Sequence, residues 1–102
     1  MRLLVFFDLP VKGKRERREA TQFRNFLLND GFYMIQFSLY GRICNTIESA
    51  KLHEERVSSK VPKSGSVRSL IVTEKQYASM NILTGQLKRK EKKIVSQQLS
   101  FF

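Results

Sequence analysis

A chain of 102 residues with 41% apolar content is long enough for one domain with a hydrophobic core, which excludes a largely disordered protein. Its one cysteine, Cys44, excludes an intrachain disulfide and a cysteine-based metal cluster, as is usual in a reducing cytosol. The sequence shows no leader-like start, and its apolar runs fall far short of the roughly 20 residues of a membrane span. We therefore expect a cytoplasmic protein without a membrane contact.

The formal net charge is +10, from 19 lysines and arginines against nine aspartates and glutamates. Much of the excess falls in two segments, 12–24 and 88–93. Basic residues at this density repel one another unless an anion accompanies them, and nucleic acid is the commonest polyanionic partner. The charge therefore favours a nucleic-acid-binding protein, with a merely solvated basic surface or an anionic membrane surface as the weaker alternatives.

The first expected element is a strand over residues 3–9. This run is apolar without polar alternation, which is typical of a strand covered on both faces. Pro10 and Gly13 then bracket a short turn. Residues 14–30 carry apolar side chains three and four positions apart, which predicts a helix, and Gly31 suits its left-handed cap. The chain is thus expected to begin with a strand–turn–helix unit.

Residues 32–43 return to strand character and are long enough for one bent strand or two short ones. Apolar residues alternate here with more polar ones, so we expect one apolar face and one mixed face. Ser38 and Tyr40 fall on the mixed face. Each is either a ligand to a phosphate or a metal-bound water, or an ordinary strand residue with its hydrogen bonds satisfied.

A second helix is expected after Asn45, which we take as its N-cap, and it ends before Pro62. The only histidine, His53, falls in a charged stretch of this helix and is expected at the surface. Cys44 is expected to be buried as a small apolar residue. The remaining expected elements are a strand, a helical turn and two short strands, at 67–73, 74–80, 81–87 and 94–99.

This order of elements predicts an α/β sandwich with a ferredoxin-like βαββαβ arrangement, in which both main helices cover one face of the sheet. We expect residues 1–80 to form this domain. Residues 81–102 are expected to form a C-terminal β tail that packs on a partner chain. A sheet with one open face would gain from a second copy, so we expect a homodimer.

Asp8 stands at the end of the first apolar run, directly before Leu9 and Pro10. Burying an ionised carboxylate costs several kcal/mol unless a cation or hydrogen-bond donors compensate its charge. One interpretation is structural, with Asp8 capping the turn or pairing with a nearby arginine. The other is a magnesium ligand, because Mg²⁺ prefers carboxylate oxygens and a symmetric dimer would bring two copies of Asp8 to one ion.

Basic residues follow Asp8 closely, around the start of the first helix. Backbone amides at a helix amino end favour an anion, and arginine forks match phosphate oxygens. We therefore predict a nucleic-acid-binding surface. Its residues are Lys12, Lys14, Arg15, Arg17, Arg18, Tyr40 and Arg42. Glu16 and Glu19 leave ordinary pairing on the helix surface open as an alternative.

Several segments in residues 1–80 form a distinctive set in their order and spacing. They are Leu4–Pro10, the arginine-bearing helix, Asn29–Phe32, Met34–Tyr40 and Gly65–Leu70. Together they resemble the small "Cas-two" proteins of CRISPR adaptation, most closely the version that accompanies type II systems. Ser38 occupies the serine position of the family's motif.

The resemblance implies a homodimer in which the final strand of one subunit can extend the sheet of the other. It implies that Asp8 is the magnesium ligand and catalytic residue of metal-dependent RNA or DNA cleavage, with Arg15, Arg17 and Tyr40 associated with that activity. It also implies that the dimer bridges two dimers of the CRISPR integrase, the "Cas-one" protein, and lies along the protospacer duplex during spacer acquisition in antiviral defence.

Two interpretations from different classes stay open. In one, the chain is a metal-dependent endonuclease or endoribonuclease centred on Asp8. In the other, it is a non-catalytic scaffold that holds duplex DNA while the integrase does the chemistry. The charge distribution favours the scaffold and the resemblance supports the nuclease. A small regulator that binds amino acids or nucleotides is a third possibility, which the positive charge disfavours.

Overall fold

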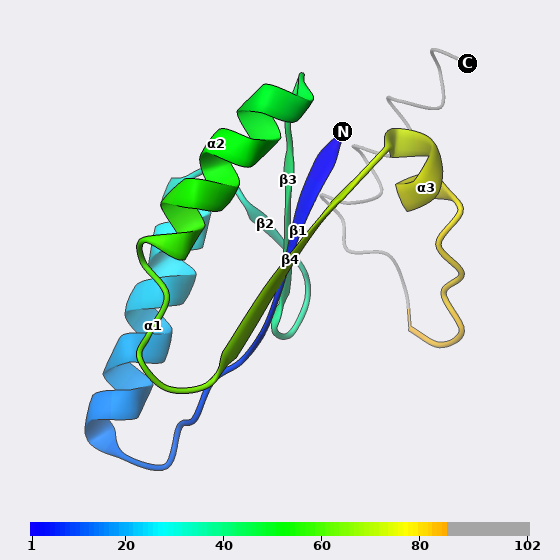
Figure 1. Ribbon diagram of the computed structural model, residues 1–102. Coiled ribbons are helices and arrows are strands. Elements are labelled where there is room, and N and C mark those ends of the chain that lie inside the picture. The colour runs from blue at the N-terminus through cyan, green and yellow to red at the C-terminus, as the bar shows by residue number, and fades with distance from the viewer. Residues whose placement is uncertain (86–102) are drawn as a thin grey trace.

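The computed structural model describes residues 1–85, which form a four-stranded antiparallel sheet and three helices (Figure 1). The elements in chain order are β1 (Arg2–Asp8), α1 (Lys14–Asn29), β2 (Tyr33–Gln36), β3 (Leu39–Ile43), α2 (Ile47–Ser58), β4 (Ser66–Val72) and α3 (Glu74–Ala78). The strand order is β2-β3-β1-β4. The predicted ferredoxin-like βαββαβ arrangement is confirmed, with α1 and α2 on one face of the sheet and α3 on the other (Figure 1).

The main core lies between the sheet and the helices α1 and α2. Alternate residues of β1 point into it, because successive side chains of a strand face opposite sides. Phe7 packs edge-on against Phe23 of α1, with 5.4 Å between ring centroids. The buried residues of this core are Leu3, Val5, Phe7, Phe23, Leu27, Phe32, Tyr40, Cys44, Ala50 and Val57. The burial expected for Cys44 and for the apolar face of the first helix is confirmed.

The second face of the sheet is covered only over part of its length. Arg2 is fully buried there, with its Nε 2.9 Å from Glu74 Oε2 and its guanidinium 3.9 Å from the centre of the Tyr77 ring. These contacts hold α3 against the sheet. Leu4 is buried in the same cluster, whereas Phe6 is 38% exposed. β1 is therefore covered on both faces at its amino end and on one face at its carboxyl end, which corrects the predicted double coverage.

The segment 32–43 forms two strands joined by a tight hairpin at Phe37 and Ser38. Ser38 has a φ of 66°, a left-handed conformation that is uncommon for a residue other than glycine. The β2–β3 register also shifts between Met34 and Gln36. Phe37 lies at the tip of the hairpin and is 87% exposed. Tyr40 lies opposite Met34 and shares its face, as expected. That face packs into the main core, so Tyr40 is 4% exposed and its expected polar setting was wrong.

The second half of the chain follows the expected order with local differences. Thr46, rather than Asn45, caps α2, because its side-chain oxygen accepts a hydrogen bond from the Ser49 amide at 3.0 Å. Residues 81–85 form no strand, and the other residues of the predicted β tail lie outside the described part of the chain. Within residues 1–85, no helix has the length and apolar character to cross a membrane.

Candidate functional site

Asp8 is the last residue of β1, where it lies opposite Ser66 of β4, and its side chain is exposed. Since Phe7 faces the main core, Asp8 shares the other face with Leu4 and Phe6. Its carboxylate forms no ion pair with any residue in 1–85. The apolar burial expected from the sequence is wrong, because this end of the open face lacks a covering helix. Asp8 thus keeps its hydration and its free oxygens.

The backbone of Asp8 is held by the connection from α2 to β4. Gly65 has a φ of +96°, and a Cβ atom at that position would lie 2.6 Å from the carbonyl oxygen of Asp8. The same Cβ would lie 3.0 Å from the Leu9 side chain and 3.1 Å from Pro10 Cδ. Only glycine fits so close an approach. The α2–β4 connection therefore fixes the end of β1 and the start of the following loop.

The hairpin between β2 and β3 holds the other side of this strand end. The Phe7 amide donates a hydrogen bond to the Ser38 carbonyl oxygen at 3.0 Å. This contact extends the sheet beyond the regular pairing of β1 with β3, which ends at Phe6 and Leu39. It brings the Phe37–Ser38 turn beside the residue that precedes Asp8.

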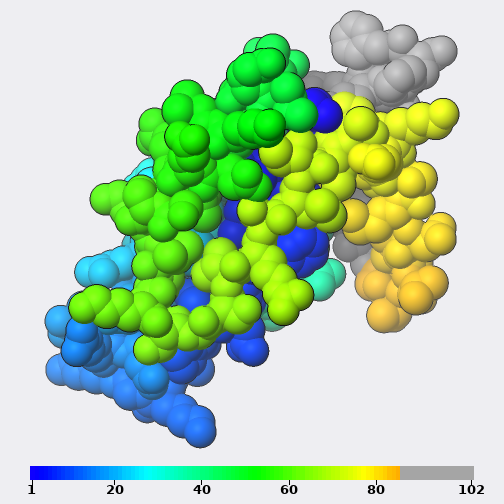
Figure 2. Space-filling view, viewed as in Figure 1, coloured from blue at the N-terminus to red at the C-terminus, as the bar shows by residue number. Residues whose placement is uncertain are grey.

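The predicted basic residues gather at the same end of the molecule. Figure 2 shows the segment around residues 10–20 projecting at the lower left, and in Figure 1 this segment follows the end of β1. Two of its arginines are engaged: Arg15 pairs with Glu19 at 3.1 Å, and Arg17 donates to the carbonyl oxygens of Val11 and Lys12 at 3.2 and 3.0 Å. Arg17 therefore stabilises the loop between β1 and α1 as well as adding charge.

Three further cations of this end are exposed and form no ion pair within residues 1–85. They are Lys12, Lys14 and Arg18. Lys14 and Arg18 are four residues apart on α1, so they lie side by side on its surface. We call Lys12, Lys14, Arg15, Arg17 and Arg18 the basic end of the protein. The structure brings all five near the carboxyl end of β1 (Figure 1).

Tyr40 and Arg42, the other two predicted nucleic-acid contacts, are placed differently. Tyr40 is 4% exposed and packs against Phe7, with 5.5 Å between ring centroids. Arg42 lies opposite Leu3, about 16 Å along β1 from Asp8. Its guanidinium donates to the carbonyl oxygens of Asp30 and Ile43, at 2.7 and 3.0 Å. The structure therefore does not bring Arg42 to the basic end.

A buried ion-pair cluster, which the sequence did not reveal, lies at that opposite end. The Asp30 carboxylate is almost fully buried, with Oδ2 2.8 Å from His53 Nδ1 and Oδ1 2.7 Å from an Arg56 guanidinium nitrogen. His53 is mostly buried, so its predicted surface position is wrong. The cluster ties the carboxyl end of α1 to α2. Nothing in the sequence paired Asp30 with His53, which is 23 residues away.

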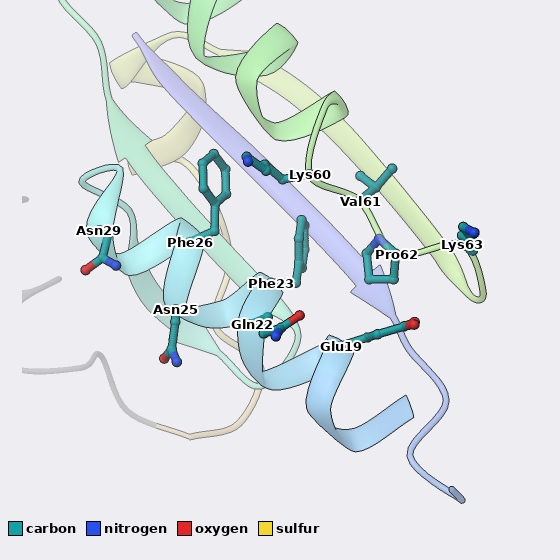
Figure 3. A pocket seen from close by; sticks show the side chains of 10 residues that line it. All are labelled: Glu19, Gln22, Phe23, Asn25, Phe26, Asn29, Lys60, Val61, Pro62 and Lys63. Carbon is teal, nitrogen blue, oxygen red and sulfur yellow. The ribbon is translucent and has the colours of Figure 1, made fainter. Parts of the chain in front are cut away.

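A groove of about 600 Å³ lies between α1 and the α2–β4 connection. Figure 3 shows Phe23 and Phe26 extending from α1 toward Lys60, Val61 and Pro62. None of the predicted site residues lines it. One lining residue, Glu19, pairs with Arg15, so the groove borders the basic end.

The metal-binding capacity of one chain is limited. No group of three or more His, Cys, Asp or Glu side chains placed to hold a metal ion occurs in residues 1–85. The exposed carboxylate of Asp8 fits a hard cation such as Mg²⁺, which accepts one or two carboxylates and keeps several waters. Within residues 1–85, Asp8 thus offers one carboxylate ligand.

The fold agrees with what known proteins show. The family model described as "CRISPR associated protein Cas2" matches residues 1–80. The chain belongs to the Cas2 family. It therefore has a CRISPR-associated role, and the predicted family resemblance is confirmed.

Individual Cas2 proteins match over most or all of the chain. A CRISPR-associated endoribonuclease Cas2 from Acidovorax ebreus is 55% identical over 102 residues, which cover 100% of both chains. One from Ligilactobacillus salivarius is 50% identical over 86 residues, covering 84% of this chain and 85% of that protein. The crystal structure of Streptococcus pyogenes Cas2 superimposes with a TM-score of 0.62 at 16% identity, covering 82% of this chain and all of that one. That structural likeness supports the fold.

Proposed function

We propose that this Cas2 chain is a nucleic-acid-binding subunit of CRISPR adaptation, which holds the backbone of protospacer duplex DNA during spacer acquisition. The observation that carries the proposal is the basic end, where Lys12, Lys14 and Arg18 are exposed without a carboxylate partner in the described residues. Unpaired cations of one sign at a protruding end attract a polyphosphate and release its counter-ions. Phosphate contacts of this kind position a duplex without specifying its sequence.

We further propose that the protein works as a homodimer. The part of the open face that α3 leaves uncovered carries Phe6 and Leu70, which are 38% and 51% exposed on neighbouring strands. A second copy on this face would bury both side chains and bring two Asp8 carboxylates toward the symmetry axis. Such a dimer has a basic end at each side, which suits a subunit that bridges two dimers of the CRISPR integrase along a duplex.

The test of the nucleic-acid surface is duplex binding by a charge-reversal variant. Lys14→Glu combined with Arg18→Glu is expected to weaken binding of a blunt DNA duplex at least tenfold and to reduce the salt slope by about 0.9 for each lost phosphate contact. Lys51→Glu combined with Lys75→Glu is the matched control, since both lysines are exposed and distant from the basic end. Equal affinity and equal salt slopes in the two variants would show that the duplex lies elsewhere.

A second candidate function is magnesium-dependent endonuclease or endoribonuclease activity at Asp8. Two observations favour it: the similar proteins from A. ebreus and L. salivarius are named endoribonucleases, and the Asp8 carboxylate is exposed with no competing cation in the described chain. Bound Mg²⁺ would polarise a phosphodiester and activate water for its cleavage. The chain itself would supply Asp8 as ligand, and the basic end would orient the phosphates of an RNA or DNA strand.

A further inference from the structure

We infer that the hollow beside the β2–β3 hairpin binds an unstacked nucleobase, with Phe37 stacking on the base and Arg24 pairing with the adjoining phosphate. The inference rests on the proposed nucleic-acid binding and adds the place where an unpaired nucleotide lies. It does not depend on cleavage at Asp8, because the site needs neither a carboxylate nor a metal ion.

The hollow has a volume of about 430 Å³, within the range of small-ligand sites in proteins. Its lining residues are Phe7, Arg24, Met34, Phe37, Ser38 and Tyr40. Phe7 and Tyr40 are core residues, so they form a rigid aromatic floor. Phe37 is an apolar residue of the β2–β3 turn, and Arg24 is a charged residue of α1. A rigid apolar floor with one cation is suited to a flat ring that carries a phosphate.

Phe37 is 87% exposed at the tip of the hairpin, although seven other phenylalanines are available to build a core of this size. The turn that carries it is fixed, because the Ser38 carbonyl oxygen accepts the Phe7 amide hydrogen bond. An exposed aromatic ring on a fixed turn offers a stacking surface with little conformational entropy to lose. Every nucleobase has a π-face, so such a ring binds single strands without sequence preference.

Arg24 supplies the charge. Its side chain is half-buried, and its guanidinium donates to the Thr21 hydroxyl at 3.3 Å without an ion pair to any described carboxylate. Guanidinium groups pair well with phosphate oxygens. Arg24 follows Arg17 by seven residues on α1, so the two lie on the same side of the helix, about 10 Å apart along its axis. A strand that passes Arg17 of the basic end can therefore reach the hollow along this side of α1.

The position of the hollow separates it from the proposed dimer face. Phe7 and Tyr40 belong to the core between the sheet and the helices, whereas Phe6 and Leu70 lie on the opposite face of the sheet. A second copy on the open face would leave the hollow accessible. Among the residues that line the hollow, Phe37 is the one exposed large apolar side chain, which makes a small apolar patch for a protein contact.

Equilibrium binding of two probes tests the inference, a short single strand containing 2-aminopurine and a blunt duplex. Phe37→Ala is expected to weaken single-strand binding about tenfold and to abolish the fluorescence quenching that stacking causes, with little change for the duplex. Phe37→Trp should retain both signals. Arg24→Ala should weaken single-strand binding and reduce its salt slope. Leu28→Ala, another exposed apolar residue, is the matched control and should bind as the wild type does.

Three results would overturn the inference. Unchanged single-strand binding and quenching in Phe37→Ala would show that the hollow holds no base. Equal losses for both probes, accompanied by a change in oligomeric state, would identify Phe37 as a protein contact. Failure of the wild type to bind either probe would refute the proposed function as well. If the duplex binds and Phe37→Ala leaves single-strand binding intact, only the nucleobase site is refuted.

Discussion

The imidazole Nδ1 of His53 lies 2.8 Å from one carboxylate oxygen of Asp30, and Arg56 holds the other oxygen at 2.7 Å. Asp30 is also the C-cap of α1, and its carbonyl oxygen accepts a hydrogen bond from Arg42 at 2.7 Å. One residue thereby joins the end of α1 to α2 through its side chain and to β3 through its backbone. This cluster stabilises the end of the domain away from Asp8.

Replacing Asp30 by alanine should destabilise the protein by about 1–3 kcal/mol, because His53 loses its partner in a mostly buried position. Arg56→Ala should also destabilise the protein by about 1–3 kcal/mol, because it leaves the buried Oδ1 of Asp30 without its donor. Urea unfolding followed by circular dichroism measures both. Asp8→Ala is the control with an exposed carboxylate. If Asp30→Ala loses no more stability than Asp8→Ala, the Asp30 cluster does not stabilise the domain.

A second stability prediction concerns the glycine behind Asp8. Gly65→Ala should destabilise the protein by at least about 2 kcal/mol, because it combines an unfavourable φ with a Cβ 2.6 Å from the Asp8 carbonyl oxygen. Gly85→Ala is the matched control: its φ is +95°, but nothing lies within 4 Å of the added Cβ. The difference between the two midpoints in urea isolates the clash. If Gly65→Ala and Gly85→Ala lose the same amount of stability, the α2–β4 connection does not pack closely against the backbone of Asp8.

Much of the fold was predictable because hydrophobic periodicity reports which face of an element is buried. Residues 14–30 showed a three-four spacing, and Phe23 and Leu27 are indeed in the core. The alternation over residues 32–43 placed Tyr40 on the same face as Met34, where it lies. It did not show that α1 and α2 cover this face, so the burial of Tyr40 was not predicted.

The site was predicted in part for the same reason. The basic residues follow Asp8 so closely in the chain that any short turn keeps them together. His53 and Asp30 are 23 residues apart, and only the packing of α1 against α2 brings them into contact. Asp8 is exposed because α3 covers only part of that face of the sheet. The sequence of β1 alone does not show how far this cover extends. Properties set by distant contacts escaped prediction from the sequence.

A third prediction tests the homodimer. Phe6→Glu combined with Leu70→Glu should shift the protein from dimer to monomer in analytical ultracentrifugation, since burying two added charges per subunit costs several kcal/mol. Leu52→Glu, on the exposed side of α2, is the control and should leave the dimer intact. If the double variant sediments as the wild type does, the open face is not the dimer interface. A monomeric wild type would refute the proposed homodimer itself.

The last prediction separates cleavage from binding. Asp8→Ala should reduce magnesium-dependent cleavage of RNA or DNA at least about 100-fold, because loss of the ligand removes several kcal/mol of transition-state stabilisation. Duplex binding should stay equal or become slightly tighter, since a negative charge near the basic end is removed while the exposed side chain contributes little to the fold. Cleavage assays and binding isotherms on the same preparation measure the two effects.

If the wild type cleaves neither RNA nor DNA with any divalent metal, the nuclease candidate is wrong and the proposed nucleic-acid-binding function is unaffected. If Asp8→Ala cleaves as well as the wild type, the catalytic groups lie elsewhere, and Asp8 is then a surface carboxylate held in place by Gly65.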